Sequence, residues 1–161
     1  MVKFLSKEKH TKRLHIMSRN KLIHHLSELL ADTYILTLKT QNYHWNVTGA
    51  HFSAYHSFLE SQYEDLFKAA DSIAERIRAL NSPAPGSYAV FSKLASLKEE
   101  TEVPKASQMI KNLAKDHEKI IANISKILKV AQTEKDEGTA DFLIERLRDH
   151  EKTLWMLKSC D

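Results

Sequence analysis

The sequence predicts an all-α protein: a four-helix bundle with a short extra helix in the connector between its second and third long helices. Only three Gly and three Pro occur among 161 residues, so few positions interrupt helical backbone. Hydrophobic residues make up 42% of the chain and charged residues 28%, a composition typical of soluble globular domains. Apolar residues recur at helical spacing in four long segments, which a bundle would bury against one another. These segments are 18–48, 50–82, 104–132 and 139–160.

Glycine and proline mark the ends of these segments. Gly49 separates the first two, and Gly138 precedes the fourth. The second segment ends at the Pro- and Gly-rich residues 83–86. The following residues, 87–103, are too many for a tight hairpin, and we expect a short helix within them at 88–97. A connector of this length fits a crossover that leaves the second and third long helices pointing the same way.

The second long segment carries two stripes on a helical wheel. One stripe is apolar and is expected to face the bundle core. The other stripe holds His56 and several carboxylates and faces outward, and Phe67 lies among them, which indicates a surface that a partner covers. The apolar stripe contains Phe58, Leu59, Leu66, Ala69, Ala70, Ile73, Ile77 and Leu80.

The outward stripe offers two pairs of possible metal ligands. His56 and Glu60 are four residues apart, as are Asp71 and Glu75, so each pair shares one helix face. Between the pairs the helix rises by roughly 22 Å, whereas a metal ion sits about 2 Å from its ligands. One chain therefore cannot hold one ion with both pairs. If the helix packs antiparallel on its own copy, crossing near residues 65 and 66, each pair meets the partner's other pair, and two symmetric sites form.

His44, near the end of the first segment, is a candidate additional ligand, although a histidine here also suits a helix C-terminus. Imidazole together with carboxylates favours iron, manganese or zinc. Ferritins commonly place Glu-x-x-His motifs inside one bundle. This sequence contains no such motif, which favours the interface over an intrachain centre.

The N-terminus is basic and the remainder is acidic. Residues 1–21 contain seven basic residues and one acidic residue, a charge of +6, while the whole chain carries +3, so the rest carries −3. We expect residues 1–17 to form a flexible arm and residues 18–161 to form the bundle domain. Such an arm is a candidate contact for a polyanion such as DNA. Its basic residues are Lys3, Lys7, Lys9, Lys12 and Arg13.

The remaining composition favours the cytoplasm. The only cysteine, Cys160, excludes an internal disulfide and suits a reducing compartment. No apolar run of membrane-spanning length occurs, and the first residues lack the apolar core of a secretory signal. We therefore expect a cytoplasmic protein, for which the basic arm offers a means of association with the nucleoid.

Several motifs resemble the Dps family, the miniferritins that protect DNA during starvation. They are His44-Trp45-Asn46-Val47, Gly49, Phe52, His56, Asp71-x-x-Ala74-Glu75-Arg76 and, later, Leu154-Trp155-Met156. The resemblance covers roughly residues 26–158. It implies a ferritin-like four-helix bundle, assembled as a homo-oligomeric shell of twelve subunits with ferroxidase centres at two-fold interfaces.

The resemblance also implies how the site works. His44, His56 and Glu60 would come from one subunit and Asp71 and Glu75 from the other, binding Fe(II) and oxidising it, with hydrogen peroxide preferred over dioxygen. The Fe(III) product would be stored as mineral in the shell, and zinc would compete for the site. Family members usually have Asp where this chain has Glu60, a longer side chain that puts the relative occupancy of the two iron positions in question.

Acidic residues surround the start of the fourth segment. Acids at this position commonly stabilise a helix N-terminus. In the family, acids here line three-fold pores that admit Fe(II), because a negative channel concentrates cations. The candidates are Asp136, Glu137, Asp141 and Glu145.

Two other functions remain open from the sequence. The chain is alternatively a structural nucleoid protein that condenses DNA through its basic arm, a role compatible with iron storage. It is also alternatively a helical bundle used for protein contacts, with a solvated carboxylate stripe. Peroxide-dependent oxidation of Fe(II) separates the first hypothesis from these two.

Overall fold

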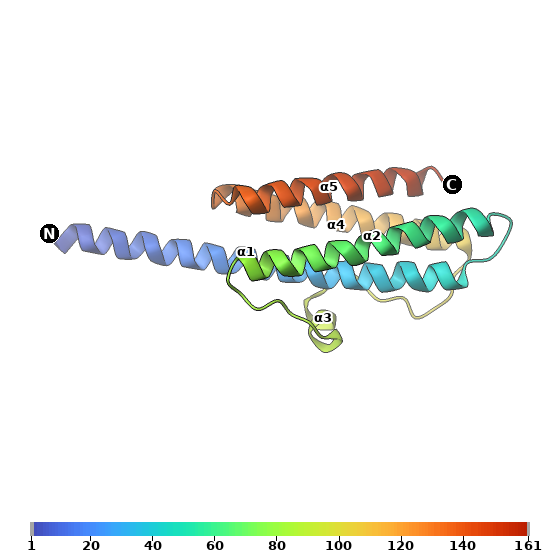
Figure 1. The fold of residues 1–161 in the computed structure, drawn as a ribbon, viewed down its shortest axis with the longest axis horizontal. Helices are drawn as coiled ribbons and strands as arrows, with labels where there is room; N and C mark the ends of the chain where they lie inside the picture. The colour runs from blue at the N-terminus through green and yellow to red at the C-terminus, as the bar shows by residue number, and fades with distance from the viewer. Residues whose placement is uncertain (1, 161) are drawn as a thin grey trace.

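The computed structural model describes residues 2–160, with side chains described from residue 19 onward. Over these residues the protein contains helices and no strand. Four long helices form an elongated bundle, and one short helix lies beside it on the connector (Figure 1). The helices are α1 (Val2–Asn46), α2 (Phe52–Ala79), α3 (Tyr88–Leu94), α4 (Ala106–Thr133) and α5 (Glu137–Lys158). The predicted all-α four-helix bundle with an extra helix in the connector is confirmed.

The connector between α2 and α4 is a crossover. α1 and α2 run antiparallel, and α4 and α5 do the same (Figure 1). Between α2 and α4 the chain travels back along the bundle and carries α3 on the way, so that α2 and α4 point in the same direction (Figure 1). The crossover predicted from the length of the connector is therefore confirmed.

Most helix boundaries differ from the sequence prediction by one to three residues, and the start of α1 differs by more. α1 begins at Val2, not at residue 18, and its N-terminal part projects beyond the bundle (Figure 1). α3 ends at Leu94, not at residue 97, because the Asp32 carboxylate on α1 accepts hydrogen bonds from the backbone N–H groups of Ser96 and Leu97 at 2.6 and 2.9 Å. These bonds hold the chain in a non-helical path.

The start of α5 also differs, since this helix begins at Glu137 and not at residue 139. The Asp136 side chain caps this helix by accepting a hydrogen bond from the Thr139 backbone N–H at 3.0 Å. Gly138, predicted to interrupt the helix, lies within its first turn.

The core runs along the whole bundle. The predicted apolar stripe of α2 faces it, since all its members are buried except Phe58, which is half-buried. Phe67, predicted to point outward, is 62% exposed. Among the described residues, every helix is too short or too polar to cross a lipid bilayer. Buried members of the core include Leu22, Leu26, Leu29 and Leu36 from α1, Leu59, Leu66, Ile73 and Ile77 from α2, Ile120, Ile124 and Ile127 from α4, and Leu143 and Leu157 from α5.

Candidate metal site

The turn between α1 and α2 brings two candidate ligands together. Gly49 has a φ of 112°, a conformation that L side chains rarely adopt, and it lets the chain reverse within a few residues. His44, in the last turn of α1, then meets His56, in the second turn of α2. Their rings stack with centroids 3.8 Å apart and planes inclined by 22°. Residues twelve positions apart thus form one imidazole pair.

Two reciprocal hydrogen bonds fix the proton on each ring. The Nδ1 atom of His44 lies 2.8 Å from the carbonyl oxygen of His56, and the Nδ1 atom of His56 lies 3.0 Å from the carbonyl oxygen of His44. A carbonyl oxygen only accepts, so both Nδ1 atoms carry hydrogen and donate. In the neutral rings, each Nε2 atom then keeps a free lone pair. This is the form in which histidine binds a metal, with the opposite nitrogen held by the protein.

Aromatic and polar neighbours hold the pair in place. The Phe52 ring lies against His56 with centroids 5.1 Å apart, and Tyr63 meets His44 edge-on at 5.2 Å. One residue before His44, the buried Tyr43 hydroxyl donates a hydrogen bond to Glu100 at 2.7 Å, which fastens the last turn of α1 to the connector. Burial, with a smaller contribution from Glu100, raises the pKa of Tyr43 above its usual range, so the hydroxyl stays protonated as a donor.

The carboxylates divide as their spacing predicts. Glu60 is exposed one turn after His56, while Asp71 and Glu75 are exposed along the second half of α2. Among the described residues, none of these three carboxylates has a hydrogen bond or ion pair within the chain. Nor do the described residues bring three or more His, Cys, Asp or Glu side chains of one chain into a metal-binding group. A single subunit therefore presents two incomplete ligand sets.

An apolar groove lies between the two sets. It has a volume of about 430 Å³ and runs between α1, α2 and α3. Phe67 and Tyr88 are 62% and 73% exposed along it, and Leu38 is 42% exposed. Large apolar side chains at this exposure favour a surface that another protein covers.

The acidic candidates at the start of α5 differ among themselves. Asp136 is half-buried and bonded to Thr139, and it also pairs with Arg76 of α2 at 2.7 Å. Burial alone raises its pKa, but the bonds from Thr139 and Arg76 outweigh this, and the pKa falls below its usual value. Asp136 thus has a structural role as a helix cap. The remaining acids, Glu137, Asp141 and Glu145, are exposed.

The candidate DNA-contacting side chains of residues 3–13 lie outside the described residues. The backbone of this segment belongs to α1, and its contact with DNA stays a prediction.

Comparison with known proteins identifies the class. A sequence profile of the ferritin-like domain matches residues 23–160. The crystal structure of a Dps protein from Vibrio cholerae, described as a member of a superfamily of ferritin-like diiron-carboxylate proteins, superimposes with a TM-score of 0.86. Its sequence is 31% identical, and the match covers 89% of this chain and 90% of that one. The bundle is thus ferritin-like.

Sequence relatives show to which family of ferritin-like proteins the chain belongs. The DNA protection during starvation protein of Porphyromonas gingivalis is 35% identical, with 83% of this chain and 84% of that protein covered. An uncharacterised low temperature-induced protein of a Nostoc strain is 43% identical over 143 residues, which are 88% of this chain and 80% of that protein. The chain belongs to the Dps family of miniferritins.

Sequence reasoning named candidate ligands but did not predict the hydrogen bonds that hold His44 and His56. Nothing in the spacing of residues 44 and 56 indicates that each ring donates to the other residue's carbonyl. The edge contact of Tyr63 with His44 was also missed, although Tyr63 follows Glu60 by three residues and so lies on a neighbouring part of the same helix face.

Proposed function

We propose that this protein oxidises Fe(II) at sites shared by two copies of the chain and stores the Fe(III) product as mineral inside a hollow shell. The observation that carries the proposal is the split set of candidate ligands: two imidazoles whose Nδ1 atoms are held by carbonyl oxygens near one end of α2, and two carboxylates without a partner in the described residues toward the other. The described residues of one chain bring no group of three or more such side chains together. The imidazoles of one half and the Asp71 and Glu75 carboxylates of the other complement each other as donors.

A two-fold axis joins the halves. His56 and Glu75 are equally distant in sequence from the point between residues 65 and 66, and so are Glu60 and Asp71. If two α2 helices cross there in antiparallel orientation, each member of one pair lies opposite a member of the other, twice. Phe67 lies next to the crossing point, and burial against the partner would explain its exposure in a single subunit.

The proposed chemistry assigns a role to each side chain. The Nε2 atoms of His44 and His56 and the Glu60 carboxylate bind Fe(II) from one subunit, and the partner supplies its Asp71 and Glu75. The carboxylates add negative charge, which stabilises Fe(III) more than Fe(II) and so favours loss of an electron. Two Fe(II) ions give one electron each to hydrogen peroxide. The O–O bond breaks, and the two oxygen atoms take up protons from water and end as water or hydroxide. Zinc, which prefers the same donors, would compete.

The shell and its location are part of the proposal. A closed homo-oligomer, a dodecamer by analogy with the family, supplies the cavity for the mineral, and exposed Asp141 and Glu145 line the route by which Fe(II) reaches it. The family names support iron storage and DNA protection, since one relative is a DNA protection during starvation protein. Removing Fe(II) and peroxide together would deny the cell the hydroxyl radicals that cut DNA. Such a role places the protein in the cytoplasm.

The experiment is peroxide-dependent oxidation of Fe(II), followed by the absorbance of ferric products in an anaerobic stopped-flow. Wild-type protein should consume about two Fe(II) per peroxide and retain the iron in solution as a protein-bound core. A variant with both His44→Ala and His56→Ala should oxidise iron no faster than buffer. Equal rates for the wild type and this variant would remove the assignment.

A second candidate function, binding of DNA, is favoured by charge. Residues 1–21, which include the arm, carry +6 while the remainder carries −3, so the N-terminal residues should attract a polyanion that the rest of the chain repels. A shell would display one arm per subunit, and many weak phosphate contacts add up to stable binding. Nucleoid association is compatible with iron storage, and it is the alternative role if the iron chemistry fails.

A further inference from the structure

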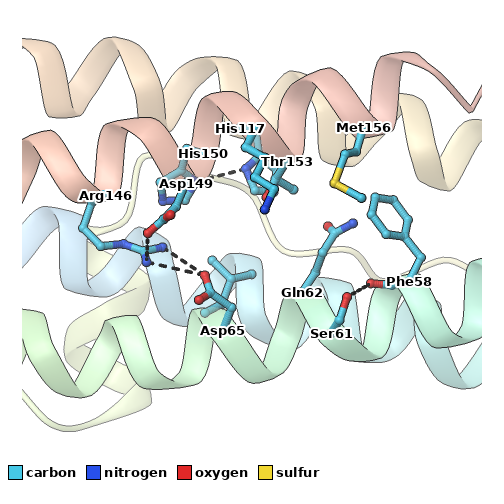
Figure 2. A pocket seen from close by; sticks show the side chains of 12 residues that line it. Phe58, Ser61, Gln62, Asp65, His117, Arg146, Asp149, His150, Thr153 and Met156 are labelled. Atoms are coloured by element: carbon cyan, nitrogen blue, oxygen red, sulfur yellow. Dashed lines mark hydrogen bonds and ion pairs between the residues drawn. The ribbon is translucent and has the colours of Figure 1, made fainter.

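A second polar site lies inside the bundle, away from the imidazole pair. A cavity of about 260 Å³ opens between α2 and α5, with α4 at its back (Figure 2). His117 of α4 and His150 of α5 meet there with their Nδ1 atoms 2.9 Å apart, and both side chains are 2% exposed. Gln62 reaches in from α2 and is 6% exposed. Three helices thus direct buried polar groups into one space.

Four buried atoms in this cluster have no hydrogen-bond partner in the protein. They are both amide atoms of Gln62, the Nε2 atom of His117 and the Nε atom of Arg146. A buried polar group without a hydrogen-bond partner lowers the stability of the folded protein, and buried polar groups in native proteins nearly always have partners. Leucine or methionine at position 62 would have filled the same space without this cost. The arrangement therefore points to an occupant.

Charge restricts the kind of occupant. The Arg146 guanidinium is already neutralised, since it contacts Asp149 at 2.9 Å and Asp65 at 3.4 Å. An anion would have to compete with these carboxylates. A cation would face the guanidinium, and among the described residues no group of three or more potential metal ligands surrounds the cavity. Burial lowers the pKa of both histidines, so the pair itself is uncharged at neutral pH.

The atoms without partners indicate which hydrogen-bonding groups the occupant must have. The Gln62 Nε2 and Arg146 Nε atoms are donors, whereas the Gln62 Oε1 atom accepts. The occupant must therefore both accept and donate. We propose that this cavity binds hydrogen peroxide, a small neutral molecule that both donates and accepts and can replace the water that otherwise fills such a cavity. Only the naming of peroxide rests on the proposed function. The volume holds several molecules of this size, given about 30 Å³ for one water.

Met156 provides a reporter for peroxide in this cavity. Its side chain lines the same space and faces it from α5, across from Gln62 (Figure 2). A sulfur lone pair attacks one peroxide oxygen, the O–O bond breaks, and the second oxygen leaves as water. The sulfur loses two electrons and becomes a sulfoxide, and the peroxide gains them. Bound peroxide should thus oxidise Met156 with saturating kinetics, whereas attack from solvent is proportional to concentration.

The test uses full-length, iron-free protein with a chelator present and hydrogen peroxide as the probe, so its result does not depend on ferroxidase activity. The rate of Met156 sulfoxide formation is measured by peptide mass spectrometry over a range of peroxide concentrations. In the wild type the rate of sulfoxide formation should level off as the peroxide concentration rises. A rate strictly proportional to peroxide would overturn the proposal, and this measurement needs no variant.

Gln62→Leu and Ser61→Ala form a matched pair of variants. Gln62→Leu removes hydrogen bonds to the occupant, and the initial slope should fall roughly fivefold for each bond lost. Ser61 lines the same cavity, but its hydroxyl already donates to the Phe58 carbonyl oxygen at 2.8 Å, so Ser61→Ala should keep the wild-type curve. Equal initial slopes for Gln62→Leu and wild type would contradict the assignment of Gln62.

Discussion

Mild acid is predicted to destabilise this protein through the buried pair of His117 and His150. Burial, followed by the nearby charge of Arg146, lowers the pKa of His117 from 6.5 to about 3. Burial and then the charges of His117 and Arg146 lower the pKa of His150 well below 6.5. In mild acid these two histidines are therefore protonated in the unfolded chain but remain neutral in the folded chain. The stability from this pair is complete above pH 6.5 and falls as the pH drops toward 3.

The size of the effect follows from the shift. Between pH 7 and pH 5 the unfolded state gains about 2 kcal/mol from protonating a histidine whose folded counterpart remains neutral. His117 contributes this amount, and His150 adds to it in the same direction. Against a total of about 5–15 kcal/mol for an ordinary domain, such a loss is large. Carboxylates titrate mainly below this window, so the histidines dominate it.

The assay is guanidinium unfolding, followed by tryptophan fluorescence at pH 7, 6 and 5 and at one fixed protein concentration. Replacing both partners by apolar residues, His117→Leu with His150→Leu, should leave the stability at pH 7 within about 2 kcal/mol of wild type and remove most of the loss at pH 5. His24→Gln, at an exposed histidine, is the matched control and should keep the wild-type slope. An unchanged pH dependence in the double variant would refute the reasoning.

Three further predictions concern assembly, iron uptake and DNA. Phe67→Ala should weaken the pairing of subunits by at least about 2 kcal/mol, seen as dissociation in native mass spectrometry, because it empties the centre of the proposed contact; an unchanged assembly would argue against that contact. Asp141→Asn with Glu145→Gln should slow iron uptake most at low Fe(II), and unchanged initial rates at every concentration would remove the pore assignment. Deleting residues 1–16 should abolish a gel shift of DNA that the full chain produces at low salt, and equal behaviour of the two proteins would show that the arm is not the contact.

The sequence predicted the fold well because its signals are local. The scarcity of glycine and proline, the apolar stripe of α2 and the length of the connector each depend on one segment, and the structure confirms what they predicted. The end of α3 was predicted wrongly because a distant residue decides it. α3 ends before the predicted residue because Asp32, more than sixty residues away, accepts hydrogen bonds from the backbone N–H groups of Ser96 and Leu97.

The sequence predicted which residues the candidate metal site contains, but not how their side chains are held. Helical geometry separated His56 and Glu60 from Asp71 and Glu75, and one chain indeed leaves both pairs open. The hydrogen bonds that set the tautomers of His44 and His56 depend on the turn geometry at Gly49. The pairing of His117 with His150 joins two helices, and no spacing rule links those positions.

The central claim is that each metal site takes ligands from two subunits, and mixed shells test it most directly. One chain carries His44→Ala and His56→Ala, and the other carries Asp71→Ala and Glu75→Ala. Each chain alone is expected to be inactive. When the two are co-assembled in equal amounts, about half of the two-fold interfaces are mixed, and each of these holds one intact site and one that lacks four of its five ligands. The account predicts that peroxide-dependent Fe(II) oxidation returns to about a quarter of the wild-type rate. Shells confirmed as mixed by native mass spectrometry, yet no more active than their parents, would contradict it.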